Sequence, residues 1–338
     1  MRRFSVQVRG GPPTKGEKVI VEGKTKTITR LTEQEAAKNW NASEAPYKHL
    51  VNIKTKNRLT ANDAAIDATA IVAAEKTNQT CDVFRYLEKQ EIPTAFISQT
   101  NAMNFIAREC EMIPYECVAR RKAYGSYLKR NSKAMAGDVF GKGLHGEYQD
   151  PLIEFFYKLA VVPNEETVEI LPEDTARDFY LREGEWTRPV YTDPLMIWKW
   201  ADWRLAGENR DSLEDFNVGL YPAKQAQANF NNILTTIPSL VTPNEYEQIK
   251  KLTAKTFLAL EKAWKKFDVE LIDMKIEFGR DLNTGNILLA DVIDNDSWRI
   301  WPGGDPKKQL DKQSFRDGED LDAVTEKYTI VTEYTSKF

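Results

Sequence analysis

The stretch Leu271–Trp301, with the sequence LIDMKIEFGRDLNTGNILLADVIDNDSWRIW, is the part of the chain from which we predict both the central fold element and a site. Its first run alternates between apolar and charged residues, which is typical of a strand with one buried face. Three charged residues, Asp273, Lys275 and Glu277, share the other face. Turn-forming residues then separate this run from a second, nearly continuous apolar run. The stretch is therefore predicted to form two strands joined by a turn.

Acidic residues also crowd the end of the second strand, where Asp291 is followed by Asp294 and Asp296. A hairpin that sets Glu277 near Asp291, with Lys275 beside them, would suit Mg²⁺ and a triphosphate, because magnesium takes one or two carboxylates plus phosphate oxygens. The alternative interpretation is a charged solvent face on an ordinary hairpin, with cross-strand ion pairs.

Composition narrows the class of protein. A chain of 338 residues predicts two domains or lobes. The net charge of −4 gives no overall attraction to nucleic acid or to an anionic membrane. With 2 histidines and 3 cysteines the chain has little material for histidine-rich metal catalysis, a Ser/His nucleophile or a disulfide framework. Because no apolar run reaches membrane-spanning length and no signal-peptide pattern is present, we expect a cytoplasmic protein without nucleic-acid or membrane partners.

Two basic segments are candidates for binding anions. Residues 18–29 predict a hairpin about a glycine turn, with Lys24 and Lys26 pointing to the same side, as suits the phosphates of a nucleotide. Further on, a β-prone run ends in Arg120, and a glycine turn then leads into a short helix with Ser126 at its N-cap. The first amides of this helix, together with Arg120, predict a site for a ribose phosphate. The alternatives are a solvated lysine face and a basic surface helix.

Six segments in order carry a resemblance to one enzyme family. They are Glu22–Lys26 (EGKTK), Tyr115–Arg130 (YECVARRKAYGSYLKR), Leu152–Lys158 (LIEFFYK), Asp273–Gly279 (DMKIEFG), Leu289–Pro302 (LADVIDNDSWRIWP) and Asp311–Asp317 (DKQSFRD). Together they resemble phosphoribosylaminoimidazole-succinocarboxamide synthase, also called SAICAR synthetase. Each motif is weak alone, whereas six in this order, across most of the chain, are specific.

The resemblance implies an ATP-dependent ligase of de novo purine biosynthesis. Its substrates would be ATP with Mg²⁺, carboxyaminoimidazole ribonucleotide and L-aspartate, and the imidazole carboxylate would be activated as an acyl phosphate. Such chemistry depends mainly on positioning and on cations that offset the repulsion among anionic reactants. It needs no nucleophilic side chain, in agreement with the scarcity of histidine.

The implied fold is α+β and two-lobed, with an N-terminal lobe of antiparallel sheet like a kinase small lobe, a larger α/β lobe and an ATP cleft between them. We accordingly expect a flexible arm at 1–17, an N-terminal β-rich ATP-binding lobe at 18–113 and an α/β substrate- and Mg²⁺-binding lobe at 114–338. An acidic, proline-containing insertion at about 159–192 interrupts the second lobe. Whether the protein is a homo-oligomer is left open.

Matching motifs also imply roles for individual residues. The catalytic candidates are Lys275 and Asp273, and the metal ligands are Glu277 and Asp291. The ATP-binding candidates are Lys24, Lys26, Met112 and Lys158, with Met112 facing adenine. The substrate-binding candidates are Arg120, Ser126 and Arg299 for the ribonucleotide phosphate, and Asp63, Lys312 and Arg316 for the imidazole or the aspartate.

The chain departs from the family pattern at Ala64, Gln79 and Leu159, where the family often has glycine, lysine and an acid. The missing lysine removes one cation, so these departures and the insertion leave a second hypothesis open: a ligase or small-molecule kinase on the same scaffold with a different acceptor. A third hypothesis is a nucleotide-binding regulator without catalysis. The intact set of charged candidate residues argues against it, because a retired site need not keep every charge.

Overall fold

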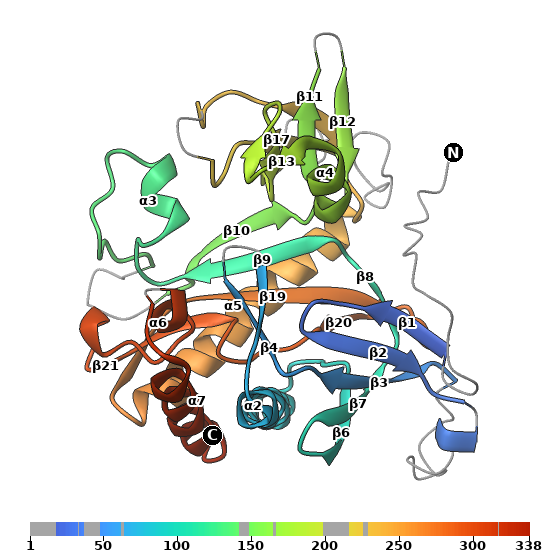
Figure 1. Cartoon of the computed structure of the whole chain (residues 1–338), viewed down its shortest axis with the longest axis vertical. Helices are drawn as coiled ribbons and strands as arrows, with labels where there is room; N and C mark the ends of the chain where they lie inside the picture. The colour runs from blue at the N-terminus through green and yellow to red at the C-terminus, as the bar shows by residue number, and fades with distance from the viewer. Residues whose placement is uncertain are drawn as a thin grey trace. The chain divides into compact units, whose positions relative to one another are not determined.

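The computed structural model describes residues 18–32, 34–36, 48–61, 64–141, 149–164, 167–198, 216–225, 229–316 and 318–338. Helices and strands are mixed along the chain (Figure 1), which confirms the predicted α+β class. None of the described helices is long and apolar enough to cross a lipid bilayer. The arm predicted at 1–17 lies outside the described residues.

The described residues form two compact units. Those before Met112, together with Lys266–Val269 and Gly279–Phe338, make up the first, and Met112–Lys265 with Glu270–Phe278 make up the second. This division returns the end of the chain to the first unit, whereas the sequence analysis places it in the 114–338 lobe. The reason is that the C-terminal helix packs against a helix from the first hundred residues. The functional lobes themselves stay a prediction.

The first unit contains a five-stranded antiparallel sheet with the order β1-β2-β3-β7-β6. Its strands are β1 (Lys18–Glu22), β2 (Lys26–Arg30), β3 (Leu50–Thr55), β6 (Phe96–Asn101) and β7 (Asn104–Arg108). The turn between β1 and β2 is closed by the Gly23 amide, which donates to the Lys26 carbonyl at 2.9 Å. The predicted glycine-centred hairpin is therefore confirmed.

Two helices of the first unit, α2 (Ala70–Lys89) and α7 (Leu321–Thr335), lie side by side in Figure 1. The side chain of Thr69 caps α2, and that of Asp320 caps α7. Burial of apolar side chains from both helices holds them together, because Val72 shares a buried cluster with Val324 and Tyr328. The side chains that α2 and α7 do not commit to this core are available to the polar network described below.

The remaining elements of the first unit are short. They are β4 (Arg58–Ala61), β5 (Ala64–Asp67), β20 (Ile287–Ala290), β21 (Trp298–Pro302), the 3₁₀ helix η1 (Pro306–Lys308) and α6 (Gln313–Arg316), and β8 (Cys110–Met112) stands at the boundary between the units. The Asp281 amide donates to the Asn286 carbonyl at 2.9 Å and closes the turn that leads into β20. This confirms the predicted strand–turn–strand.

The second unit is organised on strands in the order β18-β17-β16-β10-β9-β19. They are β9 (Tyr115–Arg120), β10 (Leu152–Tyr157), β16 (Leu195–Trp198), β17 (Asn217–Tyr221), β18 (Thr235–Pro238) and β19 (Val269–Asp281). The alternation predicted for β19 assigns its apolar residues to one buried face, since Ile272, Met274 and Ile276 are all buried. The expectation of a single buried face is wrong, however, because Asp273 and Glu277 on the charged face are each only 6% exposed. Antiparallel pairing sets Asp273 opposite Arg120, and Lys275 opposite Val118. Charged side chains of β9 and β19 therefore share one face of the sheet.

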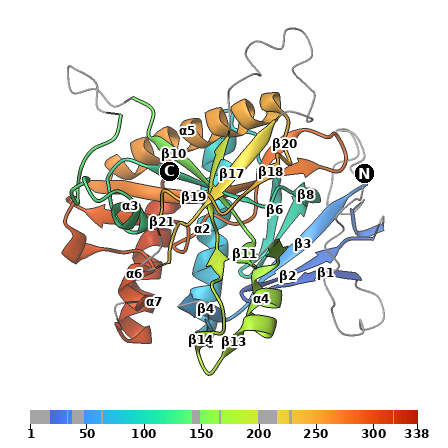
Figure 2. The same cartoon turned by 90° about the horizontal axis from the view of Figure 1, so that it is seen from above.

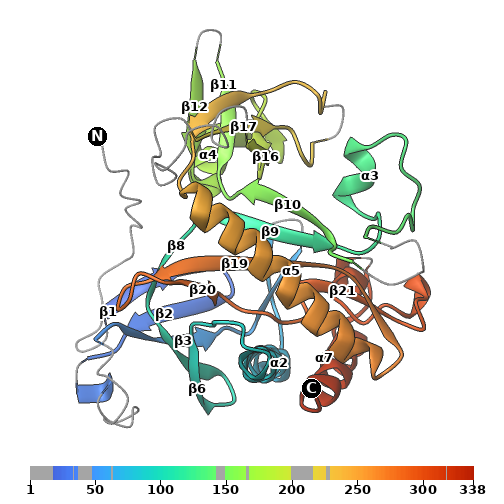
Figure 3. The same ribbon diagram turned by 180° about the vertical axis from the view of Figure 1, so that it is seen from behind.

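The helix α5 (Pro243–Lys265) packs on β9 and β10, as Figure 3 shows. A capping box starts it: the Thr242 amide donates to the Glu245 carboxylate at 2.8 Å, and the Glu245 amide donates to the Thr242 hydroxyl at 3.2 Å. Its apolar stripe, which includes Phe257 and Leu260, is fully buried. A second helix of this unit, α3 (Ser126–Arg130), has only five residues.

The insertion predicted at about 159–192 forms a small module with its own core (Figure 2). Its elements are β11 (Ala160–Pro163), β12 (Val168–Leu171), α4 (Glu173–Tyr180), β13 (Leu181–Arg182), β14 (Glu185–Trp186) and β15 (Tyr191–Thr192). The core buries Val162, Ala176 and Val190. Because the Asp193 amide donates to the Leu159 carbonyl at 3.2 Å, the module begins and ends at one neck.

Candidate functional site

Lys275 is held on the charged face of the second unit by an acid that the sequence analysis did not name. Its ammonium donates to Glu116 Oε1 at 2.8 Å, and Glu116 is the more buried partner, with 13% of its side chain exposed against 41% for Lys275. Burial alone would lower the pKa of Lys275, but Glu116 and Glu277 together raise it above its ordinary range. Lys275 is therefore a fixed cation at neutral pH and not a proton acceptor.

Glu116 is correspondingly an obligate anion. Burial alone would raise its pKa, but Lys275 and Lys224 outweigh this and lower the pKa of Glu116 to about 2. Lys224 in turn pairs with Asp193 at 2.5 Å, at the neck of the inserted module. The acid under Lys275 is thus part of a chain of alternating charges within the second unit.

A second lysine–carboxylate pair in this unit joins Lys158, just after β10, to Glu277 on β19. The distance between Lys158 Nζ and Glu277 Oε2 is 2.6 Å. The carboxylate is 8% exposed and the lysine 38% exposed. In this pair, as in Lys275–Glu116, the acid is therefore much more buried than the lysine.

Arg120 is buried and held by two carboxylates. Its Nε donates to Glu154 at 2.7 Å and one terminal nitrogen donates to Asp273 at 2.6 Å, while the other terminal nitrogen lies 3.5 Å from the Ser126 hydroxyl. The structure therefore brings the two predicted phosphate-binding residues, Arg120 and Ser126, together. The predicted N-cap is wrong, however: the cap is Gly125, whose φ of 62° turns the chain, and Ser126 is the first residue of α3.

In the first unit, Lys26 on β2 forms an ion pair with Asp291 at the end of β20, and both side chains are about one-fifth exposed. Asp291 has a φ of 62°, a left-handed conformation that few residues other than glycine adopt. The neighbouring candidate, Lys24, is exposed in the turn that precedes β2.

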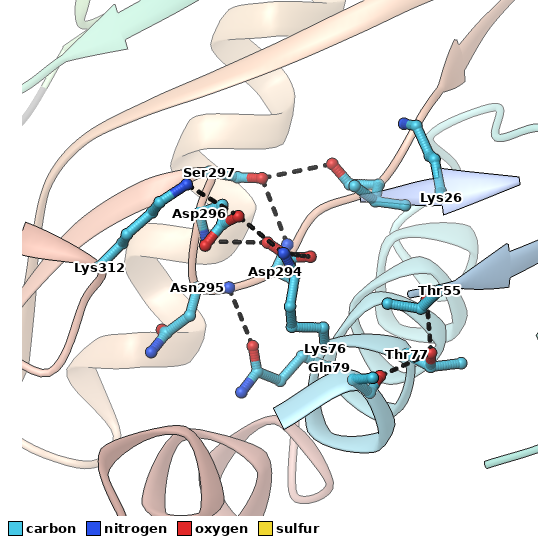
Figure 4. A network of polar contacts seen from close by, with 12 residues as sticks. Lys26, Thr55, Lys76, Thr77, Gln79, Asp294, Asn295, Asp296, Ser297 and Lys312 are labelled. Atoms are coloured by element: carbon cyan, nitrogen blue, oxygen red, sulfur yellow. Dashed lines mark hydrogen bonds and ion pairs between the residues drawn. The ribbon is translucent and has the colours of Figure 1, made fainter. Parts of the chain in front are cut away.

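A buried polar network in the first unit centres on Asp296 (Figure 4). One carboxylate oxygen of Asp296 accepts from Lys76 at 2.7 Å and from Lys312 at 3.1 Å, and the other accepts from the Tyr328 hydroxyl at 2.8 Å. Lys76 also lies 3.6 Å from Asp294. Burial would raise the pKa of Asp296, but Lys76 and Lys312 hold it well below its ordinary range. Two ammonium groups and two carboxylates therefore offset one another inside the protein.

Gln79, one turn after Lys76 on α2, ties this network to the C-terminal helix. Its amide nitrogen donates to the Tyr328 carbonyl at 2.9 Å, and its amide oxygen accepts from the Asn295 backbone amide at 2.9 Å. The side chain is fully buried. A glutamine in place of lysine is accounted for here by this bridge, because a lysine could donate to the carbonyl but could not accept from the amide.

Comparisons with known proteins now bear on this geometry. The model of the SAICAR synthetase family matches residues 31–169 and 222–334. A phosphoribosylaminoimidazole-succinocarboxamide synthase of Chloroflexus aurantiacus is 32% identical over 331 residues, covering 95% of this chain and 96% of that protein. The chain belongs to the SAICAR synthetase family.

Two further relatives define the extent of the match. A probable multifunctional protein ADE2 of Caenorhabditis elegans is 33% identical over 330 residues, and this chain spans 58% of its length. A solved structure of a SAICAR synthetase in complex with ADP is 21% identical, with a TM-score of 0.57 and coverage of 95% of this chain and 98% of that one. The family resemblance seen in six sequence motifs is thus confirmed by the family match, and the solved structure confirms the fold.

The other predicted site residues are placed as follows. Met112 is the exposed last residue of β8, Arg299 is half-buried on β21, and Arg316 is exposed on α6. Lys312 is 6% exposed and Asp273 is also 6% exposed. Asp63 lies outside the described residues. The roles of all these residues in the SAICAR synthetase family reaction stay predictions.

The two predicted metal ligands belong to different units, Glu277 to the second and Asp291 to the first. Among the described residues no three His, Cys, Asp or Glu side chains gather as a ready metal cage. Either carboxylate fits Mg²⁺ nonetheless, because this ion is usually held by one or two carboxylates with water and phosphate oxygens completing the shell.

Several residues of these clusters were not predicted from the sequence, and two of them, Glu116 and Lys76, carried a signal. Glu116 lies two and four residues before Val118 and Arg120 on β9, so the alternation of this strand places it on the charged face. Lys76 falls among the buried residues Val72, Thr80 and Val83 at helical spacing on α2. A lysine on the apolar face of a helix indicates a buried counter-ion.

Proposed function

We propose that this chain is an ATP-dependent ligase that joins L-aspartate to the carboxylate of carboxyaminoimidazole ribonucleotide, releasing ADP and phosphate. The observation that carries the proposal is a family match over most of the chain, with near-complete mutual coverage of a named synthase. The geometry supports it because half-exposed lysines stand over buried carboxylates, an arrangement that offers fixed positive charge to anionic reactants.

The proposed reaction has two steps. A carboxylate oxygen of the ribonucleotide attacks the γ-phosphorus of ATP, and ADP leaves, which gives an acyl phosphate. The aspartate amine then attacks the acyl carbon and loses a proton, and phosphate leaves. Lys275 supplies positive charge beside the transferring group, since Glu116 keeps it protonated and fixes its position.

The residues that bind the reactants in this proposal are those that the matching motifs indicate. Lys24, Lys26 and Lys158 hold the ATP phosphates, Met112 faces adenine, and Glu277 and Asp291 hold Mg²⁺, which when bound offsets charge on the phosphates. Arg120, Ser126 and Arg299 hold the ribonucleotide phosphate, and Asp63, Lys312 and Arg316 lie around the imidazole or the aspartate. Asp273, predicted as catalytic, acts by holding Arg120, to which it is hydrogen-bonded at 2.6 Å.

The guanidinium of Arg120 offers a phosphate the edge that faces Ser126. Its other two contacts are short and charge-assisted, whereas the contact with Ser126 is 3.5 Å. An incoming phosphate oxygen therefore competes only with the weakest of the three partners.

The test is an ADP-release assay on the purified chain. ADP should appear only when carboxyaminoimidazole ribonucleotide, L-aspartate, ATP and Mg²⁺ are all present, and the product should carry the succinyl group by mass spectrometry. Equal ADP release without ribonucleotide or without aspartate would contradict the proposal. Release with another amine but not with aspartate would favour the alternative acceptor considered above, although the bridge made by Gln79 removes one reason for it.

A further inference from the structure

Two of the ion pairs share an unusual composition. In each, the lysine is a residue proposed to bind ATP phosphates and the acid is a residue proposed to bind Mg²⁺: Lys26 with Asp291 in the first unit, and Lys158 with Glu277 in the second. The partners lie far apart in the sequence, so each pair is a product of the fold. The combination of a lysine proposed to bind phosphate with an acid proposed to bind metal therefore occurs twice, on different strands.

Within each pair the acid is the better fixed partner. Glu277 lies in the middle of the long strand β19 and is 8% exposed, and Asp291 carries its carboxylate on a short stem with a single methylene. The lysines have flexible four-carbon stems, and Lys158 is 38% exposed. A change of partner therefore moves the ammonium and leaves the carboxylate in place.

A carboxylate already paired with an ammonium is a poor site for a free divalent cation, because the incoming ion meets a like charge at close range. The ammonium leaves without penalty only if another anion accepts it, since an unpaired, partly buried charge is costly. Nucleotide phosphates are such an anion. When both are present, the metal can bind the carboxylate of each pair and the phosphates can bind its ammonium. The metal alone or the phosphates alone would leave one partner of the pair without a counter-charge.

We propose that Lys26 and Lys158 are placeholder cations: they occupy the metal-binding carboxylates in the ligand-free protein and transfer to the nucleotide phosphates when the metal–nucleotide complex binds. The metal consequently enters with the nucleotide and not before it. This inference rests on the proposed function, because the roles of Asp291 and Glu277 as metal ligands come from that proposal.

The experiment measures binding of Mn²⁺ alone to the full chain, without nucleotide, from the loss of its free-ion EPR signal. Lys158→Met and Lys26→Met remove the ammonium but keep an unbranched stem, so each should bind Mn²⁺ about tenfold more tightly than the unaltered protein. Lys122→Met is the matched control, because Lys122 pairs with Glu270 on the same strand β19 but belongs to neither proposed site. It should leave Mn²⁺ affinity unchanged.

A second titration separates this inference from the proposed function. The unaltered protein should bind Mn²⁺ with ADP at least about tenfold more tightly than Mn²⁺ alone. If Mn²⁺–ADP binds but both methionine variants bind free Mn²⁺ no better than the unaltered protein, the placeholder role is wrong while nucleotide binding stands. If Mn²⁺–ADP fails to bind at all, the proposed function itself is wrong. Should one variant not fold, as judged by its thermal transition, the other decides the question, because the two pairs lie in different units.

Discussion

The charged face of the second unit and the buried network of the first use the same side chains in opposite ways. Around Asp296 every partner is enclosed: Lys76 is 3% exposed and Lys312 is 6% exposed. Along β9, β10 and β19 the acids are enclosed, but the side chains of Lys158 and Lys275 are more than one-third exposed. The enclosed network around Asp296 fixes the positions of chain segments. The partly exposed lysines of the second unit, paired with buried acids, can instead bind anions.

The largest expected effect breaks the closed network. Lys76→Met should lower the free energy of unfolding by about 3–5 kcal/mol, because it leaves Asp294 and Asp296 buried without a full complement of positive charge. Chemical denaturation measures this difference. Lys89→Met, at the exposed end of the same helix, is the control and should change stability by less than about 0.5 kcal/mol. Similar stabilities for the two variants would mean that the network is not a structural tie.

On the charged face of the second unit, replacing a lysine should lower turnover more than it lowers stability. Lys275→Ala should lower turnover by about 10²–10³-fold, because it removes a preorganised charge from the transition state. Its cost in stability should not exceed that of Glu116→Gln, described below, because the two variants break the same ion pair. Turnover and melting temperature of Lys275→Ala and Lys122→Ala should be compared. Near-normal turnover of the first variant would remove Lys275 from the mechanism.

Acid pH should destabilise the folded protein at the charged face of the second unit, because Glu116 becomes protonated there. Because the pKa of Glu116 is lowered from 4.5 to about 2 in the folded protein, its contribution to stability is fully present above pH 4.5 and is lost as the pH falls through about 2. At neutral pH, Glu116→Gln should cost on the order of 2–3 kcal/mol, and the difference from the unaltered protein should shrink across that pH window. Urea denaturation at several pH values tests this. A difference that does not vary with pH would show that Glu116 acts through packing alone.

The smallest expected effect concerns how well each unit shields its cysteine thiols from a reagent in solution. Burial raises the pKa of Cys81 on α2 to about 12 and that of Cys117 on β9 well above its ordinary range. At pH 8 each native thiol should react with a disulfide reagent at least about 10³-fold more slowly than in the unfolded chain. Cys110, which is half-buried with a pKa also raised to about 12, should react first among the three. Rapid labelling of Cys81 or Cys117 would indicate that its unit opens readily.

The local elements of this protein follow from local sequence. Although Asp273 and Glu277 on the charged face are buried as well, alternation in Leu271–Phe278 predicts the strand β19 and which residues share each of its faces. The glycine turn predicts the first hairpin. These succeed because each depends on residues within a few positions of one another. The cap predicted at Ser126 is a local error that arose because glycine offers a turn geometry that competes with a side-chain cap.

The partners of the charged residues were decided only by the tertiary structure. Alternation shows that Lys275 faces away from the core, but not that Glu116 lies beneath it, because 159 positions separate the two residues. Likewise a sequence cannot show that Lys76 and Lys312 share the carboxylate of Asp296, or that Gln79 bridges to Tyr328. The period of a strand or helix assigns a side chain to a face, whereas the neighbour across that face is chosen by strand order and helix packing over the whole chain.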